Sequence, residues 1–212
     1  MDSTTHQNKT QETLLVTGIG GQLAGRVVSL LLEKGHKNII GTTRKPEKVE
    51  HLKSQGVDVR AANFDQPESL AEAFRGASKM LLVSTHKIGQ RLNQHRNAIA
   101  AAKAAGVRHV IYTSIQSADR FKSIVTTEHL ETENYLKESG LKYTILRNNL
   151  YADGLIMKTK PFLQWGKFSG CAGEGAVAYV TREDCARAAA SVLLKTDGMD
   201  AESNCFDISG PK

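Results

Sequence analysis

Glycines spaced as in a phosphate-binding turn follow a short apolar run near the start of the chain. Residues 14–16 have the length of a buried parallel strand, and an amphipathic helix is expected over residues 22–34. Glycines allow a tight turn and a close backbone approach, and the N–H groups of the next helix can meet a pyrophosphate. The predicted anion-binding residues are Gly18, Gly20, Gly21, Gln22 and Leu23. An ordinary glycine-rich turn is the alternative interpretation.

The residues that follow the second expected strand indicate which dinucleotide is bound. An NAD site has an acidic residue about 20 positions beyond the glycines, where it binds the ribose 2′-hydroxyl. Here that zone holds Arg44 and Lys45 and no acid. Because arginine can bind a phosphate through two hydrogen bonds, this zone favours NADP(H), with its 2′-phosphate. Alternatively, both cations are surface charges beside Pro46.

Two further strand ends carry residues suited to the same cleft. In an open parallel sheet, ligands bind beyond the carboxyl ends of the strands. Asn63 and Phe64 follow the third expected strand, where they could contact an adenine edge and face, although Phe64 could equally cap the core. Ser84, Thr85 and His86 end the fourth strand and are expected to face the cofactor.

An alternation of strands and helices must position these residues. The expected strands are 14–16, 38–42, 57–61, 80–84, 108–113, 142–146 and 204–208, and the expected helices include 22–34, 47–55, 88–105, 125–139 and 181–195. This alternation predicts an α/β fold with a Rossmann-like parallel sheet flanked by helices. Residues 1–12 are expected to form a flexible tail, and residues 13–212 one NAD(P)-binding domain with little or no C-terminal substrate subdomain.

Composition excludes several other classes of protein. Hydrophobic residues make up 40% and charged residues 24% of the 212 residues, and no apolar run approaches the length of a membrane span. The net charge of +6 comes from scattered basic residues without interleaved aromatics, which argues against a nucleic-acid partner. The three cysteines are widely spaced, which argues against disulfides or a metal site and favours the cytoplasm. The polar N-terminus is not expected to be a secretory signal.

Several segments resemble the NmrA-like branch of the atypical short-chain dehydrogenases. The segments are TGIGGQLAG, TTRKPEK, GQRLNQHRNAIAAAKAAGVRHVIYTS, EHLETENYLKESGLKYTILRNNLY and VTREDCARAAA. Within that branch the chain is most similar to type 2 NAD(P)H:quinone oxidoreductases and triphenylmethane reductases. The resemblance implies a Rossmann fold that binds NADP(H) and passes hydride to a quinone or similar acceptor. It also implies that Thr113, Ser114 and Asn149 line the cleft.

The chain departs from this family pattern in two places. The end of the third strand, commonly acidic in the family, is Asn63, which replaces a carboxylate by an amide at the expected adenine contact. Family members usually continue beyond the segment 205–210 into a helical portion that helps to wall the acceptor site. The cofactor half of the site is therefore expected, whereas the helical wall of the acceptor half is not.

The catalytic groups differ from those of an ordinary carbonyl reductase. None of the five tyrosines is followed by a lysine four positions later, so the usual tyrosine–lysine acid is missing. In related enzymes a lysine acts near the start of the helix before the sixth strand, and the resemblance puts His129 there. His129 could donate a proton to the acceptor, or it could be structural. Tyr151 is a candidate stacking wall for the acceptor, or a core residue.

The sequence therefore predicts an NADPH-dependent oxidoreductase that acts on a quinone-like acceptor. A quinol oxyanion is stabilised by its ring, so the protein need only hold the two reactants face to face in a dry slot. A non-catalytic NADP-binding sensor is the alternative function. Neither function requires a metal, a membrane or a nucleic acid, and a homodimer is compatible with both.

Overall fold

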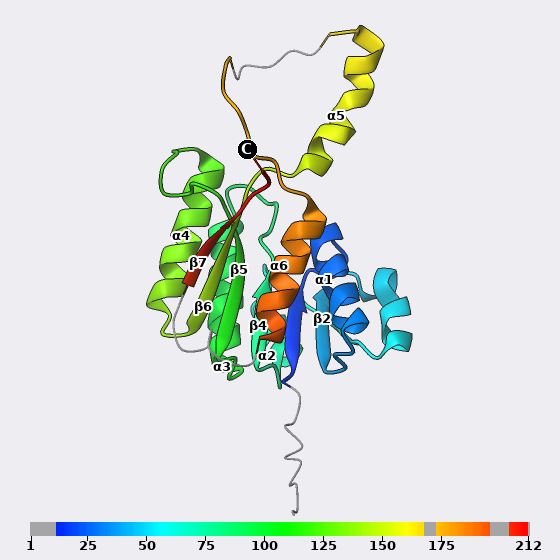
Figure 1. Ribbon diagram of the computed structural model, residues 1–212. Coiled ribbons are helices and arrows are strands. Elements are labelled where there is room, and N and C mark those ends of the chain that lie inside the picture. Colours follow the sequence, from blue (N-terminus) through cyan, green and yellow to red (C-terminus); the bar gives the residue numbers. More distant parts are fainter. Residues whose placement is uncertain (1–11, 168–172, 196–203, 212) are drawn as a thin grey trace, which may run out of the picture.

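A parallel sheet with helices on both faces forms the body of the protein (Figure 1). The computed structural model describes residues 12–167, 173–195 and 204–211. Its seven strands have the order β3-β2-β1-β4-β5-β6-β7. Their bounds are β1 Leu14–Thr17, β2 Ile39–Thr43, β3 Asp58–Ala61, β4 Lys79–Leu82, β5 His109–Ile115, β6 Lys142–Asn148 and β7 Asn204–Ile208. The Rossmann-like sheet predicted from sequence is confirmed, with strand boundaries that differ by at most two residues.

Helices cover both faces of the sheet, and α5 (Ala152–Trp165) leads away from its carboxyl edge (Figure 1). Their bounds are α1 Gln22–Glu33, the 3₁₀ segment η1 Pro46–Gln55, α2 Glu68–Phe74, α3 Arg91–Ala104, α4 Ile124–Glu138, α5 Ala152–Trp165 and α6 Arg182–Leu194. Helices α1 and α6 contact each other on one face, while α2, α3 and α4 contact one another in sequence on the other. Since every strand pair is parallel, all strands end at the same edge of the sheet.

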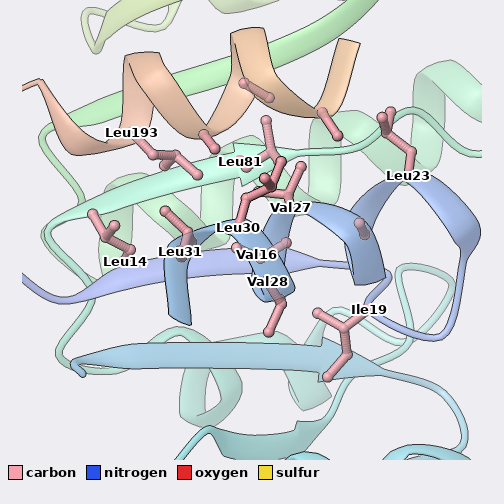
Figure 2. Packing of buried hydrophobic residues seen from close by; sticks show 14 of the residues in the cluster. Leu14, Val16, Ile19, Leu23, Val27, Val28, Leu30, Leu31, Leu81 and Leu193 are labelled. Atoms are coloured by element: carbon pink, nitrogen blue, oxygen red, sulfur yellow. The ribbon is translucent and has the colours of Figure 1, made fainter. Parts of the chain in front are cut away.

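Helix α1 shows why the sequence folds in this way. Its apolar residues recur at helical spacing, and Val27 and Leu31 are completely buried with Val16 of β1 and Leu81 of β4 (Figure 2). Full burial of such a side chain contributes about 1.5–3 kcal/mol. The helix ends before Gly35, whose φ of +77° suits glycine.

Helix α5 is the element that the sequence analysis did not predict. It leads away from the carboxyl edge of the sheet (Figure 1), and at its base Val180 bonds to the backbone of Leu150 and Ala152. Gly154 and Pro161 lie within its sequence, and both residue types disfavour a helix interior. Within the described residues, no helix is long and apolar enough to cross a membrane.

The predicted N-terminal tail ends at a residue that is bound to the sheet. The carboxylate of Glu12 pairs with Lys79 Nζ at 2.9 Å and with Arg108 Nη2 at 2.6 Å. Lys79 is itself 2% exposed, so this contact lies at the buried amino end of β4. Glu12 is therefore held against the sheet, and the rest of the predicted tail, residues 1–11, lies outside the described part.

Candidate functional site

A cavity of about 660 Å³ opens at the carboxyl edge of the sheet, above β1 to β4. This volume lies within the range of small-molecule and cofactor sites. Of the residues predicted from sequence, it is lined by Gly18, Gly20, Gly21, Arg44, Lys45, Asn63, Phe64, Ser84, Thr85 and His86. Residues that the sequence analysis did not single out complete the lining: Thr17, Thr42, Thr43, Lys48, Val49, Ala62, Val83, Lys87 and Gln94.

The glycine turn is shaped to bring the backbone close to a ligand. Gly18 has a φ of +70°, and the Gly21 N–H donates to the Gly18 carbonyl at 2.8 Å. A Cβ atom at Gly21 would lie 3.2 Å from that carbonyl oxygen, which is tighter than ordinary contact. Helix α1 begins next, with no side-chain cap and no acidic residue in its first turn. Its first N–H groups and its positive dipole end are therefore available to an anion.

Exposed cations line the mouth of the cavity beyond β2. Arg44 and Lys45 follow the strand directly, and Lys48 lies one helical turn further on in η1. All three line the same cavity as the glycine turn. Lys45 and Lys48 are three residues apart, the period of a 3₁₀ turn, and this spacing could have identified Lys48 from the sequence. This donor set suits a second phosphate, as the 2′-phosphate of NADP(H) would provide.

Two threonines hold the end of β4 against the cavity. Thr17 Oγ1 donates to the Leu81 carbonyl at 3.1 Å and accepts from the Val83 N–H at 3.0 Å. Thr113 Oγ1 accepts from the Ser84 N–H at 2.9 Å. Thr113 is 2% exposed and does not belong to the cavity lining, so it acts on the site through Ser84.

The end of β3 is joined to α3 by polar side chains. Gln94 Nε2 donates to Asp65 Oδ1 at 2.8 Å, and Asn97 Nδ2 donates to the Phe64 carbonyl at 2.8 Å. Lys87 pairs with Asp65 Oδ2 at 3.2 Å. Hydrogen bonds from Gln94 and Lys87 hold the pKa of Asp65 below its usual range. Phe64 both lines the cavity and packs beside a core cluster, and its contact with an adenine ring stays a prediction.

Three residues predicted to contact the cofactor have other partners. Side chains alternate along a strand, so Ser114 points to the opposite face from Thr113, and its Oγ donates to the buried Glu133 at 2.6 Å. Asn149 Nδ2 donates to the Ala178 carbonyl at 2.7 Å. The Leu23 side chain belongs to the core of α1, which leaves only its backbone N–H for a ligand. Gln22, in contrast, is exposed at the start of that helix.

The candidate proton donor His129 lies behind the cavity wall. It is 5% exposed, and its Nδ1 is 2.7 Å from the Tyr112 hydroxyl. Burial lowers the pKa of His129 to about 3, so the ring is neutral at pH 7. The described cavity lining does not include it, because α4 turns this side chain toward β5. His95 of α3 is also completely buried.

Tyr151 lies at the carboxyl end of β6, beside the start of α5. Its hydroxyl accepts from Asn148 Nδ2 at 3.2 Å, and the Arg182 guanidinium carbon lies 5.1 Å from its ring centre. Burial raises the pKa of its hydroxyl, which is therefore protonated at pH 7. The ring is half-buried against the α1 side of the core. Tyr151 is not part of the described cavity lining, so its contact with an acceptor stays a prediction.

Comparison with known proteins agrees with this geometry. A family model described as NAD(P)H-binding matches residues 18–196. The chain belongs to this NAD(P)H-binding family. It is 41% identical over 198 residues to quinone oxidoreductase 2 of Escherichia coli K12, an alignment that covers 93% of this chain and 68% of that protein. The NAD(P)H azoreductase of Xenophilus azovorans is 28% identical over 200 residues, with 94% and 68% covered.

Solved structures of a quinone oxidoreductase and a triphenylmethane reductase have folds closely similar to that of this chain. The NADPH complex of the quinone oxidoreductase QOR2 from E. coli superimposes with a TM-score of 0.88 at 38% identity, covering 93% of this chain and 69% of that one. Triphenylmethane reductase of Citrobacter sp. with NADP(H) gives a TM-score of 0.86 at 36% identity, covering 93% and 70%. The predicted resemblance to these two groups, the cofactor class and the assignment as an NAD(P)H-dependent oxidoreductase are thereby confirmed.

NADP(H) also fits the residues of this NAD(P)H-binding chain. The uncapped start of α1 would bind its pyrophosphate, beside Gly21, where a Cβ atom would make a tight contact of 3.2 Å with the Gly18 carbonyl oxygen. Arg44, Lys45 and Lys48 would hold its 2′-phosphate. Among the described residues, no group of His, Cys, Asp and Glu could hold a metal ion.

Proposed function

We propose that this chain reduces a quinone or a similarly conjugated acceptor with NADPH. One observation carries the proposal: the uncapped start of α1 and the cations after β2 open into the same cavity. When bound there, NADPH supplies the hydride. Quinone oxidoreductase 2 of E. coli, 41% identical, is a relative whose name states this acceptor class.

The residues of the chain would bind and orient rather than exchange protons. The glycine turn would bind the pyrophosphate, and Arg44 would bind the 2′-phosphate of the adenosine half. The Ser84–His86 segment would line the cleft beside it, held from behind by Thr17 and Thr113. His86 is exposed and lines the cavity, so it is the histidine of this cleft that could meet a ligand. His129, neutral and buried, supplies no proton at pH 7 in this account.

Tyr151 is the proposed wall of the acceptor site. It follows β6, and so stands beyond the same edge of the sheet as the cavity. An aromatic ring beside the nicotinamide end of the cleft would stack on a flat conjugated acceptor and exclude water. Because a quinol oxyanion is stabilised by its own ring, its proton can come from solvent.

Turnover tests the proposal directly. NADPH is titrated into the protein while its fluorescence is followed, and a small benzoquinone is then added to the same sample. The expected result is saturable binding followed by NADPH loss well above the protein-free rate. Tight binding of both NADPH and NADP⁺ with no turnover on several acceptors would instead support the sensor. Failure to bind either nucleotide would overturn both functions.

We also infer a reducing, cytoplasmic setting, and a homodimer is compatible with the proposed reaction. Cys185 and Cys205 are free thiols, and burial raises the pKa of Cys185 to about 12, which makes its thiol unreactive. Light scattering of the purified chain gives the oligomeric state. A monomeric mass would overturn the homodimer without affecting the proposed reaction.

A further inference from the structure

Thr85 in the wall of the cavity has both of its backbone groups bound by side chains of α3. Its N–H donates to His95 Nε2 at 3.1 Å, and its carbonyl accepts from Arg91 Nε at 2.8 Å. His95 is fully buried and Arg91 is 5% exposed. The segment between β4 and α3 is therefore fixed from behind, by groups that do not line the cavity themselves.

The hydrogen bonds of His95 determine its tautomer. A backbone N–H can only donate, so Nε2 must be the unprotonated acceptor and Nδ1 must carry the hydrogen. Nδ1 lies 3.1 Å from Thr132 Oγ1, which in turn donates to the Glu128 carbonyl at 2.8 Å. A continuous row of hydrogen bonds thus runs from the cavity wall through α3 to the backbone of α4.

The Arg91 side chain is also anchored on α4. Its Nη1 donates to Glu128 Oε2 at 3.0 Å, and its backbone N–H donates to Glu128 Oε1 at 3.2 Å. Glu128 is 7% exposed, so this ion pair is shielded from water and its geometry is well defined. Both contacts with Thr85 therefore lead back to one turn of α4.

Packing alone does not explain these residues. Buried polar groups cost free energy unless they are fully bonded, and apolar side chains of similar volume often stabilise a core better. Helix α3 nonetheless buries Arg91 and His95 against Thr85, and Gln94 against Asp65. In each case one partner belongs to a loop at the cavity, and for Arg91 and His95 a second partner lies on α4.

We propose that His95, supported by Arg91, is a positioning residue for NADP(H) binding. It holds the Thr85 amide so that residues Ser84 to His86 keep the shape of the cofactor cleft. The proposal rests on the proposed function only in taking NADPH as the ligand. It requires no contact between His95 and the cofactor.

Two polar substitutions separate positioning from a general contribution to stability. In His95→Gln the side-chain oxygen can take the place of Nε2 and accept from the Thr85 N–H. In His95→Asn the shorter side chain can reach Thr132 but not Thr85. We expect His95→Gln to bind NADPH within about twofold of the unchanged protein, and His95→Asn to bind about tenfold more weakly, because a buried N–H is left without a partner.

His109→Gln is the matched control. His109 is 3% exposed, and its Nε2 bonds to Thr144 Oγ1 at 2.9 Å at the amino end of β5, away from the cavity. This variant is expected to lower the melting temperature but leave the NADPH dissociation constant unchanged. Equal NADPH affinities of His95→Asn and His95→Gln would overturn the proposal, as would equal weakening by His109→Gln.

The Thr85 amide gives a readout that needs neither turnover nor ligand. With ¹⁵N-threonine labelling, its exchange with solvent is expected to be slow in the unchanged protein and in His95→Gln, and fast in His95→Asn. Unchanged protection in His95→Asn would overturn the proposal even if that variant were too unstable for titration. If the unchanged protein bound no NADPH, the proposed function would fail while the amide test still decided the role of His95 in holding the loop.

Discussion

Ser114 and Glu133 form a 2.6 Å hydrogen bond in which the serine hydroxyl donates to a carboxylate that is completely buried. Arg147 closes the arrangement, with Nε 3.0 Å from Oε1 and Nη2 2.7 Å from Oε2 of Glu133. The hydrogen bond with Glu133 raises the pKa of Arg147 above its usual value. The serine predicted to meet the cofactor is thus part of a buried charge pair that joins β5, β6 and α4.

Removing only one partner of the Arg147–Glu133 ion pair is expected to lower the free energy of unfolding. Arg147→Met leaves the buried Glu133 carboxylate with the Ser114 hydroxyl and the more distant Lys137 Nζ, 3.9 Å from Oε2, so the free energy of unfolding in urea should fall by up to about 3 kcal/mol. Ser114→Ala removes one neutral donor and should cost only about 1–2 kcal/mol. The double variant Arg147→Met/Glu133→Leu should recover part of the loss. A double variant less stable than Arg147→Met alone would contradict this account.

Arg44 is expected to determine the preference for NADPH over NADH. In Arg44→Ala the dissociation constant for NADPH should rise about ten- to a hundredfold, since a charge-assisted hydrogen bond contributes about 1.5–3 kcal/mol. Affinity for NADH, which lacks the 2′-phosphate, should hardly change. Lys53→Ala is the control, because Lys53 lies in η1 and pairs with Glu50 at 3.3 Å but does not line the cavity. Equal weakening of both nucleotides by Arg44→Ala would argue against this role.

The buried His129 should make the protein sensitive to acid. Burial lowers the pKa of His129 from 6.5 to about 3, so between these values the unfolded chain binds a proton that the folded chain does not. Its contribution to stability is therefore complete above about pH 6.5 and is lost as the pH falls toward 3. In His129→Gln the dependence of the unfolding free energy on pH, between 6 and 4.5, should be shallower by up to about 1.4 kcal/mol per pH unit. An unchanged slope would mean that His129 is not buried as a neutral ring.

The sheet could be predicted from sequence because its signals are local. The apolar run 14–16, the glycines after it and the cations after β2 are each contained in a few consecutive residues, and the parallel topology brings them to one edge. Helix α5 was missed because its sequence includes Gly154 and Pro161. The apolar run, the glycines and the cations can be recognised without knowledge of long-range contacts, whereas the exact ends of strands and helices depend on such contacts.

The buried polar residues of α3 and α4 could not be predicted in the same way. From sequence alone, charged and polar residues of a helix such as Arg91 and His95 are expected on the surface. They are buried in α3 because their partners, which are distant in sequence, satisfy their hydrogen bonds. His129 was identified correctly as lying near the start of α4, but its rotation about the helix axis decides whether it meets a ligand or Tyr112. One position along a strand likewise decides that Thr113 faces Ser84 while Ser114 faces Glu133.

Tyr151 is expected to act on the acceptor and not on the cofactor. Tyr151→Phe keeps the aromatic ring and loses only the hydroxyl that accepts from Asn148 Nδ2. If the ring stacks on the acceptor, this variant should keep the KM for benzoquinone within about twofold, whereas Tyr151→Leu should raise it about tenfold, since aromatic pairs contribute about 0.5–1.5 kcal/mol beyond the area they bury. The NADPH dissociation constant should be the same in both variants, because Tyr151 lies outside the described cavity lining. A rise in that constant, or a large loss of kcat in Tyr151→Phe, would instead assign the hydroxyl a role in cofactor binding or proton transfer.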